Sequence, residues 1–175
     1  MLAGELYLAT DPQLLDERAR CDRLTRAFNE EPDPESRSVL LRTLLGSVGE
    51  RVEVRPPFAC DYGSQIHLGD DVFVNFGAVI LDCAPVVLGD GCQVGPGVNI
   101  SAADHPREPG LRRDGWEFSR PVTVGRNVWI GAGAILCPGV TVGDDSIIGA
   151  GSVVTGDIPA GVVAVGSPAR VTRKL

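Results

Sequence analysis

The sequence predicts an all-β fold, a parallel β-helix, and two observations support this prediction. Aliphatic residues recur every six positions in the second half of the chain, at Val124, Ile130, Leu136, Val142, Ile148 and Val154. Glycine directly follows four of these six residues, as expected where a short strand ends in a sharp turn. A period of six is neither that of a helix nor the simple alternation of one long strand. It is typical of short strands that stack coil upon coil around three faces.

The first half of the chain carries the same series. Its members are Leu68, Val74 and Ile80 and, after a slip of two residues, Leu88, Val94 and Ile100. Three faces of six residues make a coil of 18, so the repeats account for four to five coils. At ~4.8 Å per coil, the stack is roughly 20 to 25 Å tall. An ordinary β-sandwich is the alternative, but its turns would recur every 8 to 12 residues or so.

Residues 1–50 are expected to form a helical arm ahead of the β-helix. Pro12 follows Thr10 and Asp11, either of which can cap a helix, and apolar residues then recur at helical spacing up to Phe28. Two prolines end this helix, and a second short helix is expected to follow. We expect the arm to cover the first coil, because an uncovered terminal coil exposes its strand edges.

Residues 51–165 are expected to form the β-helix, with an interruption at residues 101–120. The interruption is rich in polar residues and proline and has no aliphatic residue at the sixth positions. It therefore cannot follow the coil and is expected to project as a loop. Residues 166–175 are expected to be a basic C-terminal tail, because Arg170, Arg173 and Lys174 lie there.

Composition narrows the class of protein. The net charge of −7 argues against nucleic acid as a partner, because a duplex binder needs a clustered basic face. The five cysteines show no CxxC spacing, and there is neither a signal-peptide pattern nor an apolar run of about 18 residues. We therefore expect a cytoplasmic protein with free thiols and no membrane partner.

Four segments carry a specific resemblance: MLAGELYLATDPQLLDERAR, PPFACDYGSQIHLGDDVFVNFGAVILD, SAADHP, and the repeats from Pro121 to Val171. Together they resemble the maltose and galactoside O-acetyltransferases and nodulation protein L, over essentially the whole chain. The resemblance implies a left-handed β-helix, although right-handed crossovers are the general preference between parallel strands. It also implies acetyl-CoA as donor, a ternary complex with no covalent enzyme intermediate, and a homotrimer with its sites between subunits.

His105 is the candidate general base. Imidazole is suited to removing a proton from a hydroxyl at neutral pH. His105 lies in the projecting loop, where Pro106 favours an extended backbone, and the matching histidine is the base in the resembling enzymes. The other histidine, His67, alternates with aliphatic residues and is expected to point outward. Two histidines cannot supply the three that bind zinc in carbonic anhydrases of this fold, so no metal is expected.

Five residues are predicted to bind the acceptor: Asp11, Asp61, Phe73, Asn75 and Asp82. Asp61 and Asp82 can accept hydrogen bonds from sugar hydroxyls, or can simply be turn aspartates. The resemblance implies acceptor contacts for Asn75 and Asp11, although Asn75 also suits a corner and Asp11 a helix cap. Phe73 stands where the galactoside enzyme has tyrosine, which removes a hydroxyl from the site.

Six residues are predicted to bind the donor: Trp129, Ala132, Ala150, Thr155, Arg170 and Arg173. The resemblance implies backbone or hydroxyl contacts at the two alanines and Thr155, and guanidinium groups in the tail can grip phosphates. Trp129 is expected to serve partly as core and partly as a wall of the site. Gly156 stands where the family has lysine, so one cationic contact is missing.

The resulting prediction is an acetyl-CoA-dependent O-acetyltransferase that acts on a hydroxyl of a small sugar of the maltose, glucose or galactoside type. One alternative is acetylation of a xenobiotic or an amine by the same fold. Another is a β-helix that serves only as a scaffold or binding module. A thiol mechanism through Cys83 or Cys137 is a further chemical alternative, although both positions also suit small apolar fillers.

Overall fold

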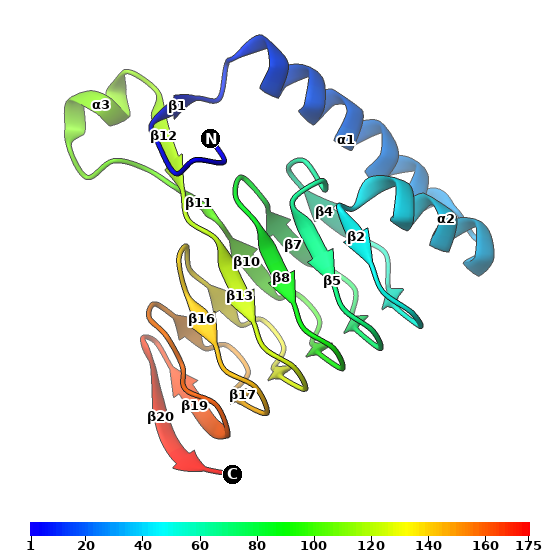
Figure 1. Cartoon of the computed structure of the whole chain (residues 1–175), viewed down its shortest axis with the longest axis vertical. Coiled ribbons are helices and arrows are strands. Elements are labelled where there is room, and N and C mark those ends of the chain that lie inside the picture. The colour runs from blue at the N-terminus through cyan, green and yellow to red at the C-terminus, as the bar shows by residue number, and fades with distance from the viewer.

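The computed structural model describes residues 1–175 as a parallel β-helix with helices at one end and a hairpin at the other (Figure 1). Sheet 1 contains β2 (Ser47–Val48), β5 (Ile66–Leu68), β8 (Val86–Leu88), β13 (Val122–Val124) and β16 (Thr141–Val142). Sheet 2 contains β3 (Glu53–Val54), β6 (Phe73–Val74), β9 (Gln93–Val94), β14 (Trp129–Ile130), β17 (Ile147–Ile148), β19 (Val162–Gly166) and β20 (Ala169–Lys174). Sheet 3 contains β4 (Phe58–Cys60), β7 (Ala78–Leu81), β10 (Asn99–Ser101), β15 (Ile135–Leu136) and β18 (Val153–Val154).

The six-residue series forms the core that the sequence predicts. In sheet 3, for example, Ile80 pairs with Ile100, which pairs with Leu136, which pairs with Val154. Each of these side chains is at most 2% exposed. Stacking therefore buries each aliphatic residue of the six-residue series against its counterpart one coil away, which stabilises the fold through removal of apolar surface from water.

The β-helix is longer than predicted, with about six coils in place of four to five. β2 pairs with β5, so the first coil already includes Ser47, ahead of the expected start at residue 51. At the other end Ile158 bridges to Val142 and adds a strand position. The early coils contain 20 residues, as from Val48 to Leu68 and on to Leu88. The two extra residues break the period of six and hide the first coil from a search for that period.

The helical arm consists of α1 (Pro12–Glu30) and α2 (Pro34–Leu44). Asp11 is the N-cap of α1, and its carboxylate accepts from the Gln13 N–H at 2.9 Å. Phe28 packs edge-on against Phe58, with ring centroids 6.3 Å apart, and the Asn29 amide bonds both the N–H and the carbonyl of Phe58. The arm therefore covers the first coil, as predicted (Figure 1).

The interruption at residues 101–120 contains regular structure: β11 (Ala103–Asp104), α3 (Pro109–Arg113) and β12 (Trp116–Ser119). β12 pairs antiparallel with β11 on one side and with β1 (Tyr7–Leu8) on the other. The excursion and the N-terminal segment thus form one small three-stranded sheet beside the β-helix (Figure 1).

The predicted basic tail is a strand, not a free tail. β20 turns back and pairs antiparallel with β19, so it extends sheet 2 at the C-terminal end. Residues 169–174 do not belong to the six-residue series, so the sequence pattern did not predict this pairing. None of the helices has the length and apolarity needed to cross a membrane.

Candidate active site

Seven of the candidate residues fall on two edges of the three-sided β-helix. We call the edge between sheets 3 and 1, where the excursion leaves, the loop edge; Asp61, Asp82, His105 and Thr155 lie on it. We call the edge between sheets 2 and 3 the asparagine edge; Asn75, Ala132 and Ala150 lie on it. One chain therefore does not bring all of the predicted residues together.

His105 lies directly after β11, at the root of the excursion, and is exposed. Its backbone N–H donates to Asp104 Oδ1 and its carbonyl accepts from Arg107 Nη1, each at 2.8 Å. No side chain of the same chain forms a hydrogen bond with its imidazole. The fold therefore fixes the backbone at this position and leaves both ring nitrogens available for chemistry.

Asp104 is the centre of the group that holds this segment. Its carboxylate accepts from Arg107 Nη1 at 2.8 Å and Nη2 at 3.1 Å, and from Arg120 Nη2 at 3.0 Å. The Asp104 side chain is only 11% exposed. Burial opposes its ionisation, but the bonds from Arg107 and from the His105 N–H outweigh burial and place the pKa of Asp104 below its ordinary value. Asp104 is thus a carboxylate at neutral pH.

Asp82 has a different role from the one predicted. It is completely buried. Its Oδ1 accepts from the N–H groups of Asp61 at 3.1 Å and Tyr62 at 2.9 Å, and its Oδ2 accepts from the N–H of Gln65 at 3.1 Å. This burial contradicts the prediction that Asp82 binds the acceptor directly. The carboxylate instead shapes the turn that presents Asp61, since buried backbone donors require a partner.

Asp61 belongs to a half-buried polar cluster at the loop edge. Its Oδ2 accepts from the Cys83 thiol at 3.4 Å, and Cys83 packs against Tyr7 and Tyr62. The Tyr7 hydroxyl donates to Glu117 Oε2 at 3.0 Å and so links the cluster to β12. Burial raises the pKa of Asp61, and it raises the pKa of the Cys83 thiol to about 12. Cys83 is therefore protonated at neutral pH, which argues against a thiolate mechanism.

The thiol alternative is no better at Cys137. This residue is half-buried beside the root of the excursion, and burial raises its pKa as well. A thiol acts as a nucleophile only as the thiolate. Neither cysteine proposed for that mechanism thus has the environment that it needs.

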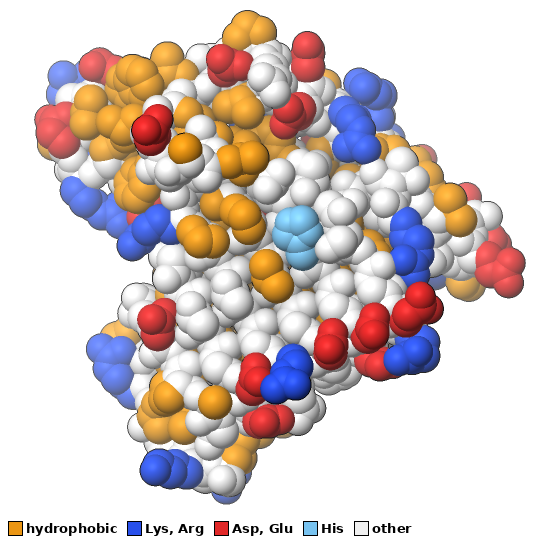
Figure 2. Space-filling model, viewed as in Figure 1, with side chains coloured by type: hydrophobic (Ala, Val, Ile, Leu, Met, Phe, Trp, Pro, Cys, Tyr) orange, Lys and Arg blue, Asp and Glu red, His pale blue; other side chains and the backbone are white.

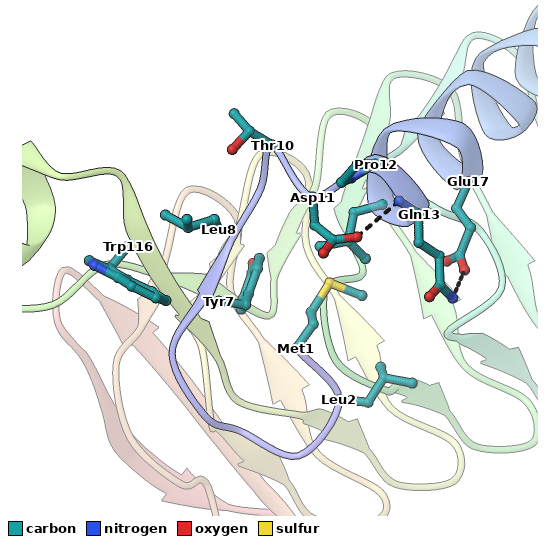
Figure 3. A pocket seen from close by; sticks show the side chains of 11 residues that line it. Met1, Leu2, Tyr7, Leu8, Thr10, Asp11, Pro12, Gln13, Glu17 and Trp116 are labelled. Carbon is teal, nitrogen blue, oxygen red and sulfur yellow. Dashed lines mark hydrogen bonds between the residues drawn. The ribbon is translucent and has the colours of Figure 1, made fainter.

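A pocket of about 690 Å³ opens between the N-terminal segment, the start of α1 and β12 (Figure 3). Gln13 and Glu17 lie at one end of the view, where they form a hydrogen bond of 2.9 Å, and Leu8 and Trp116 lie at the other. Asp11 also lines the pocket. One of its carboxylate oxygens caps α1 and the other has no partner, so the cap role and an acceptor role are compatible.

The surface around this pocket differs from the rest of the molecule. Figure 2 shows apolar side chains gathered over the N-terminal segment and the excursion, where Leu2, Leu6 and Leu8 are 56%, 44% and 36% exposed. Acidic side chains gather instead along the turns between sheets 1 and 2 (Figure 2). Asp70, Asp90 and Asp144 cap the backbone of neighbouring coils there. These acidic side chains thus lie on a different edge from the loop edge, and Arg51 and Arg126 pair with two of them, Asp71 and Asp144.

The asparagine edge carries a smaller hollow of about 270 Å³, which Phe73, Asn75, Trp129 and Ala132 line among others. The side-chain oxygen of Asn75, Oδ1, accepts from the Phe76 N–H at 2.9 Å, so the side chain does stabilise a corner. The side-chain nitrogen, Nδ2, forms no hydrogen bond within the chain and is free to donate, whereas the backbone N–H donates to the Val94 carbonyl at 2.9 Å. Trp129 is 56% exposed, which makes it a surface residue with no share in the core.

A groove of about 630 Å³ lies at the loop edge beside the excursion. Thr155 and Gly156 line one side of it, and Arg107 and Arg120 line the other. Nothing lies within 4 Å of the point where a Gly156 side chain would begin, so the missing lysine leaves this part of the groove open.

The remaining predicted donor residues lie on sheet 2 or at its edge. Ala150 follows β17 at the asparagine edge. Gly131 of the preceding coil lies against the Ala150 backbone, and a side chain at position 131 would collide with it. Arg170 and Arg173 are exposed on β20, where neither forms an ion pair. Arg170 Nη1 donates to the Ala169 carbonyl at 2.8 Å, and the other guanidinium nitrogens of the two arginines form no hydrogen bond within the chain.

The structure also places four residues at the candidate site that the sequence did not predict there: Tyr7, Asp104, Trp116 and Glu117. The alternation of Trp116, Glu117 and Phe118 was a possible signal of a strand, but nothing in the sequence pairs that strand with residues 7–8. His67 points outward as predicted and bonds Ser47 Oγ at 3.0 Å. No group of three or more His, Cys, Asp or Glu side chains is arranged to hold a metal ion.

Fold and family models together define the class of protein. The description "maltose acetyltransferase hexapeptide capping motif" matches residues 1–49, and "bacterial transferase hexapeptide (six repeats)" matches residues 121–156. These matches cover the helical arm and the later coils. Their descriptions indicate a transferase built on hexapeptide repeats, the class to which the relatives below also belong.

Relatives refine the class. Nodulation protein L of Rhizobium meliloti (strain 1021) is 50% identical over 173 residues, which cover 98% of this chain and 94% of the relative. A maltose O-acetyltransferase from Clostridium difficile 630 superposes with a TM-score of 0.98 at 46% identity, covering 99% of this chain and 94% of that one. A galactoside acetyltransferase in complex with coenzyme A superposes with a TM-score of 0.95 at 42% identity, covering 98% and 87%. The chain belongs to the maltose and galactoside O-acetyltransferase family.

Proposed function

We propose that this protein transfers the acetyl group of acetyl-CoA to a hydroxyl of a small sugar, with His105 as general base. The single observation that carries the proposal is the placement of His105, whose backbone is held at both ends while its imidazole stays free and exposed. A general base must come within hydrogen-bond reach of the substrate proton, and an exposed imidazole with no partner in the chain meets that requirement.

The donor is acetyl-CoA, as the family name and the coenzyme A bound to the galactoside acetyltransferase indicate. Thr155 would contact the donor at the loop edge, and Ala132 and Ala150 would let it lie close to the coil of a neighbouring subunit. Arg170 and Arg173 would bind its phosphates, because guanidinium combines charge with directed donors. Five free cysteines fit a cytoplasmic enzyme, since reducing compartments keep thiols reduced.

The acceptor pocket is the one of about 690 Å³ that Asp11 lines. The free carboxylate oxygen of Asp11 suits a sugar hydroxyl, as does Asp61, which is connected to the pocket residue Tyr7 through Cys83. Trp116 and Leu8 are directly paired across β1 and β12, so they form an apolar platform for the C–H face of a sugar ring. A mixed lining of this kind fits a carbohydrate better than a long acyl chain.

The complete site requires a second copy of the chain. His105 and Asn75 lie on different edges of the same β-helix, so only the Asn75 of a neighbour can approach His105. A closed ring of three copies places the asparagine edge of each subunit against the loop edge of the next. We therefore propose a homotrimer with three shared sites, in which Phe73 and Trp129 come with Asn75.

The chemical step follows from these roles. His105 takes the proton of the sugar hydroxyl as its oxygen attacks the thioester carbonyl. The Asn75 amide and nearby backbone N–H groups hold the negative oxygen of the tetrahedral intermediate, which forms where such donors are already in place. The intermediate then collapses to the sugar ester and expels the thiolate of coenzyme A. The imidazolium returns the proton to that thiolate, so no enzyme group is consumed.

An amine acceptor is the second candidate, because the carboxyl groups of Asp11 and Asp61 each keep one oxygen without a partner, which also suits a cation. The experiment compares glucosides, galactosides, their deoxy analogues, aminoglycosides and long-chain alcohols by kcat/KM, with thiol release as the readout. A sugar is expected to lead, and deoxy analogues to be rejected strongly, since a polar site left unpaired is costly. An amine or alcohol tenfold better than every sugar would overturn the acceptor assignment. Absence of thiol release with any acceptor would favour a scaffold.

A further inference from the structure

We propose that Asp104 is a positioning residue for catalysis: with Arg107 it holds the backbone of His105 in the orientation that presents the imidazole to the acceptor. The proposal rests on the proposed role of His105 as the base. It concerns how this particular chain fixes a residue that lies on a projecting segment and not on the rigid coil.

The first step of the argument is the number of bonds that converge on one carboxylate. Asp104 accepts four hydrogen bonds: one from the His105 N–H, two from the guanidinium fork of Arg107 and one from Arg120. Paired fork geometry of this type gives direction as well as charge. The Asp104 side chain is 11% exposed, whereas the side chains of Arg107 and Arg120 are 78% and 52% exposed, so the restraint depends on the convergence of four bonds on one carboxylate and not on burial of the ion pairs.

The second step is that the backbone of His105 is held from both sides. Asp104 takes its N–H, and Arg107, itself fixed by Asp104, donates to its carbonyl at 2.8 Å. Arg112 continues the restraint, since its Nη1 donates to the Pro106 carbonyl at 2.9 Å and to the Arg107 carbonyl at 3.3 Å. Three successive carbonyls are thus tied by arginines, although only β11 connects this segment to the small sheet.

The third step is where the group is anchored. Arg120 is the last residue of the excursion before sheet 1 resumes, and its N–H donates to the carbonyl of Ala102 at 2.9 Å. Asp104 therefore joins the outgoing and returning ends of the excursion and attaches His105 to the coil through Arg120. Loss of the carboxylate would release the fork of Arg107 and with it both backbone restraints on His105.

The test compares Asp104→Asn and Asp104→Ala with a matched control, Asp144→Asn. Asp144 has the same arrangement on another edge: it accepts a backbone N–H at 2.8 Å and pairs with the guanidinium of Arg126 at 2.8 Å. Asparagine keeps an oxygen for the His105 N–H but loses the charge, and alanine loses both. A misplacement of ~1 Å can cost about 10²-fold in rate.

We expect kcat to fall about tenfold in Asp104→Asn and about 10²-fold in Asp104→Ala, with KM for both substrates within threefold and the oligomer intact. The control should keep its full kcat. Equal kcat in wild type and both Asp104 variants would overturn the proposal, as would a rise in donor KM without a fall in kcat. An equal loss of kcat in Asp144→Asn would also overturn it, because the effect would then be general destabilisation.

His105→Ala separates failure of this proposal from failure of the proposed function. If His105→Ala is inactive while both Asp104 variants are fully active, the base assignment stands and the positioning role is wrong. If His105→Ala turns over like wild type, the base assignment itself is wrong.

Discussion

Replacing Asp82 tests how the loop edge is built. Asp82→Asn removes a buried charge that accepts three backbone N–H groups at 2.9 to 3.1 Å. Both carboxylate oxygens of Asp82 accept hydrogen bonds, but asparagine has only one oxygen. Its NH2 group would therefore face a backbone N–H, and that N–H would lose its acceptor. A buried unsatisfied donor costs ~1 to 3 kcal/mol, and hydrogen bonds to a charged group contribute about 1.5 to 3 kcal/mol each. Since such terms overlap, we expect a loss of about 3 kcal/mol in the free energy of unfolding.

The assay for Asp82 is thermal unfolding followed by kinetics. A loss of that size lowers Tm by roughly 6 to 12 °C in a chain of this length. Asp70→Asn is the control, because Asp70 is an exposed corner aspartate that accepts a single N–H from Glu50 at 2.7 Å, and its loss should cost less than about 1 kcal/mol. The reasoning is refuted if Asp82→Asn melts like wild type while its acceptor KM rises. That result would restore Asp82 as a direct ligand of the acceptor.

Three further predictions concern the site. His105→Ala should lower kcat by about 10²- to 10⁴-fold with donor affinity nearly unchanged, and equal turnover at saturating substrates would rule out His105 as the base. Changing both Arg170 and Arg173 to Ala should raise KM for acetyl-CoA and leave the acceptor KM unchanged. Donor binding should also depend less on salt, because two charged contacts are lost. An unaltered donor KM would mean that the two arginines do not bind the donor and serve only solubility. Trp116→Ala should raise the acceptor KM roughly 3- to 10-fold, since one aromatic contact contributes about 0.5 to 1.5 kcal/mol. Val39→Ala, a change of an exposed apolar residue on α2, should not alter it, and equal effects of the two would argue against the platform.

The coil could be predicted because aliphatic residues recur in the sequence at the same interval as the strands of the β-helix. Every aliphatic residue of the six-residue series is buried at its expected position, and the capping of α1 by Asp11 follows from local rules. The first coil escaped prediction because its extra residues at the loop edge shift the period. β20 was not predicted because it pairs only with β19 as an antiparallel hairpin, and such a strand does not have to follow the six-residue repeat.

The site was harder to predict than the coil, because its geometry depends on contacts distant in sequence. Asp82 and Asp61 look alike as turn aspartates, yet only burial separates a carboxylate that shapes a turn from one that faces a pocket. Tyr7 and Glu117 meet only because β1 pairs with β12, 110 residues away along the chain. Neither fact has a local signature.

The most direct test of the shared site is complementation between two inactive variants. His105→Ala and Asn75→Ala are each purified, mixed in equal amounts, dissociated and allowed to reassemble, and acetyl transfer is then measured. If the two residues act from neighbouring subunits, each mixed trimer keeps one intact site, and the mixture should recover about a quarter of the wild-type rate. If both residues act from the same chain, every site carries one of the two substitutions and the mixture stays as inactive as its components.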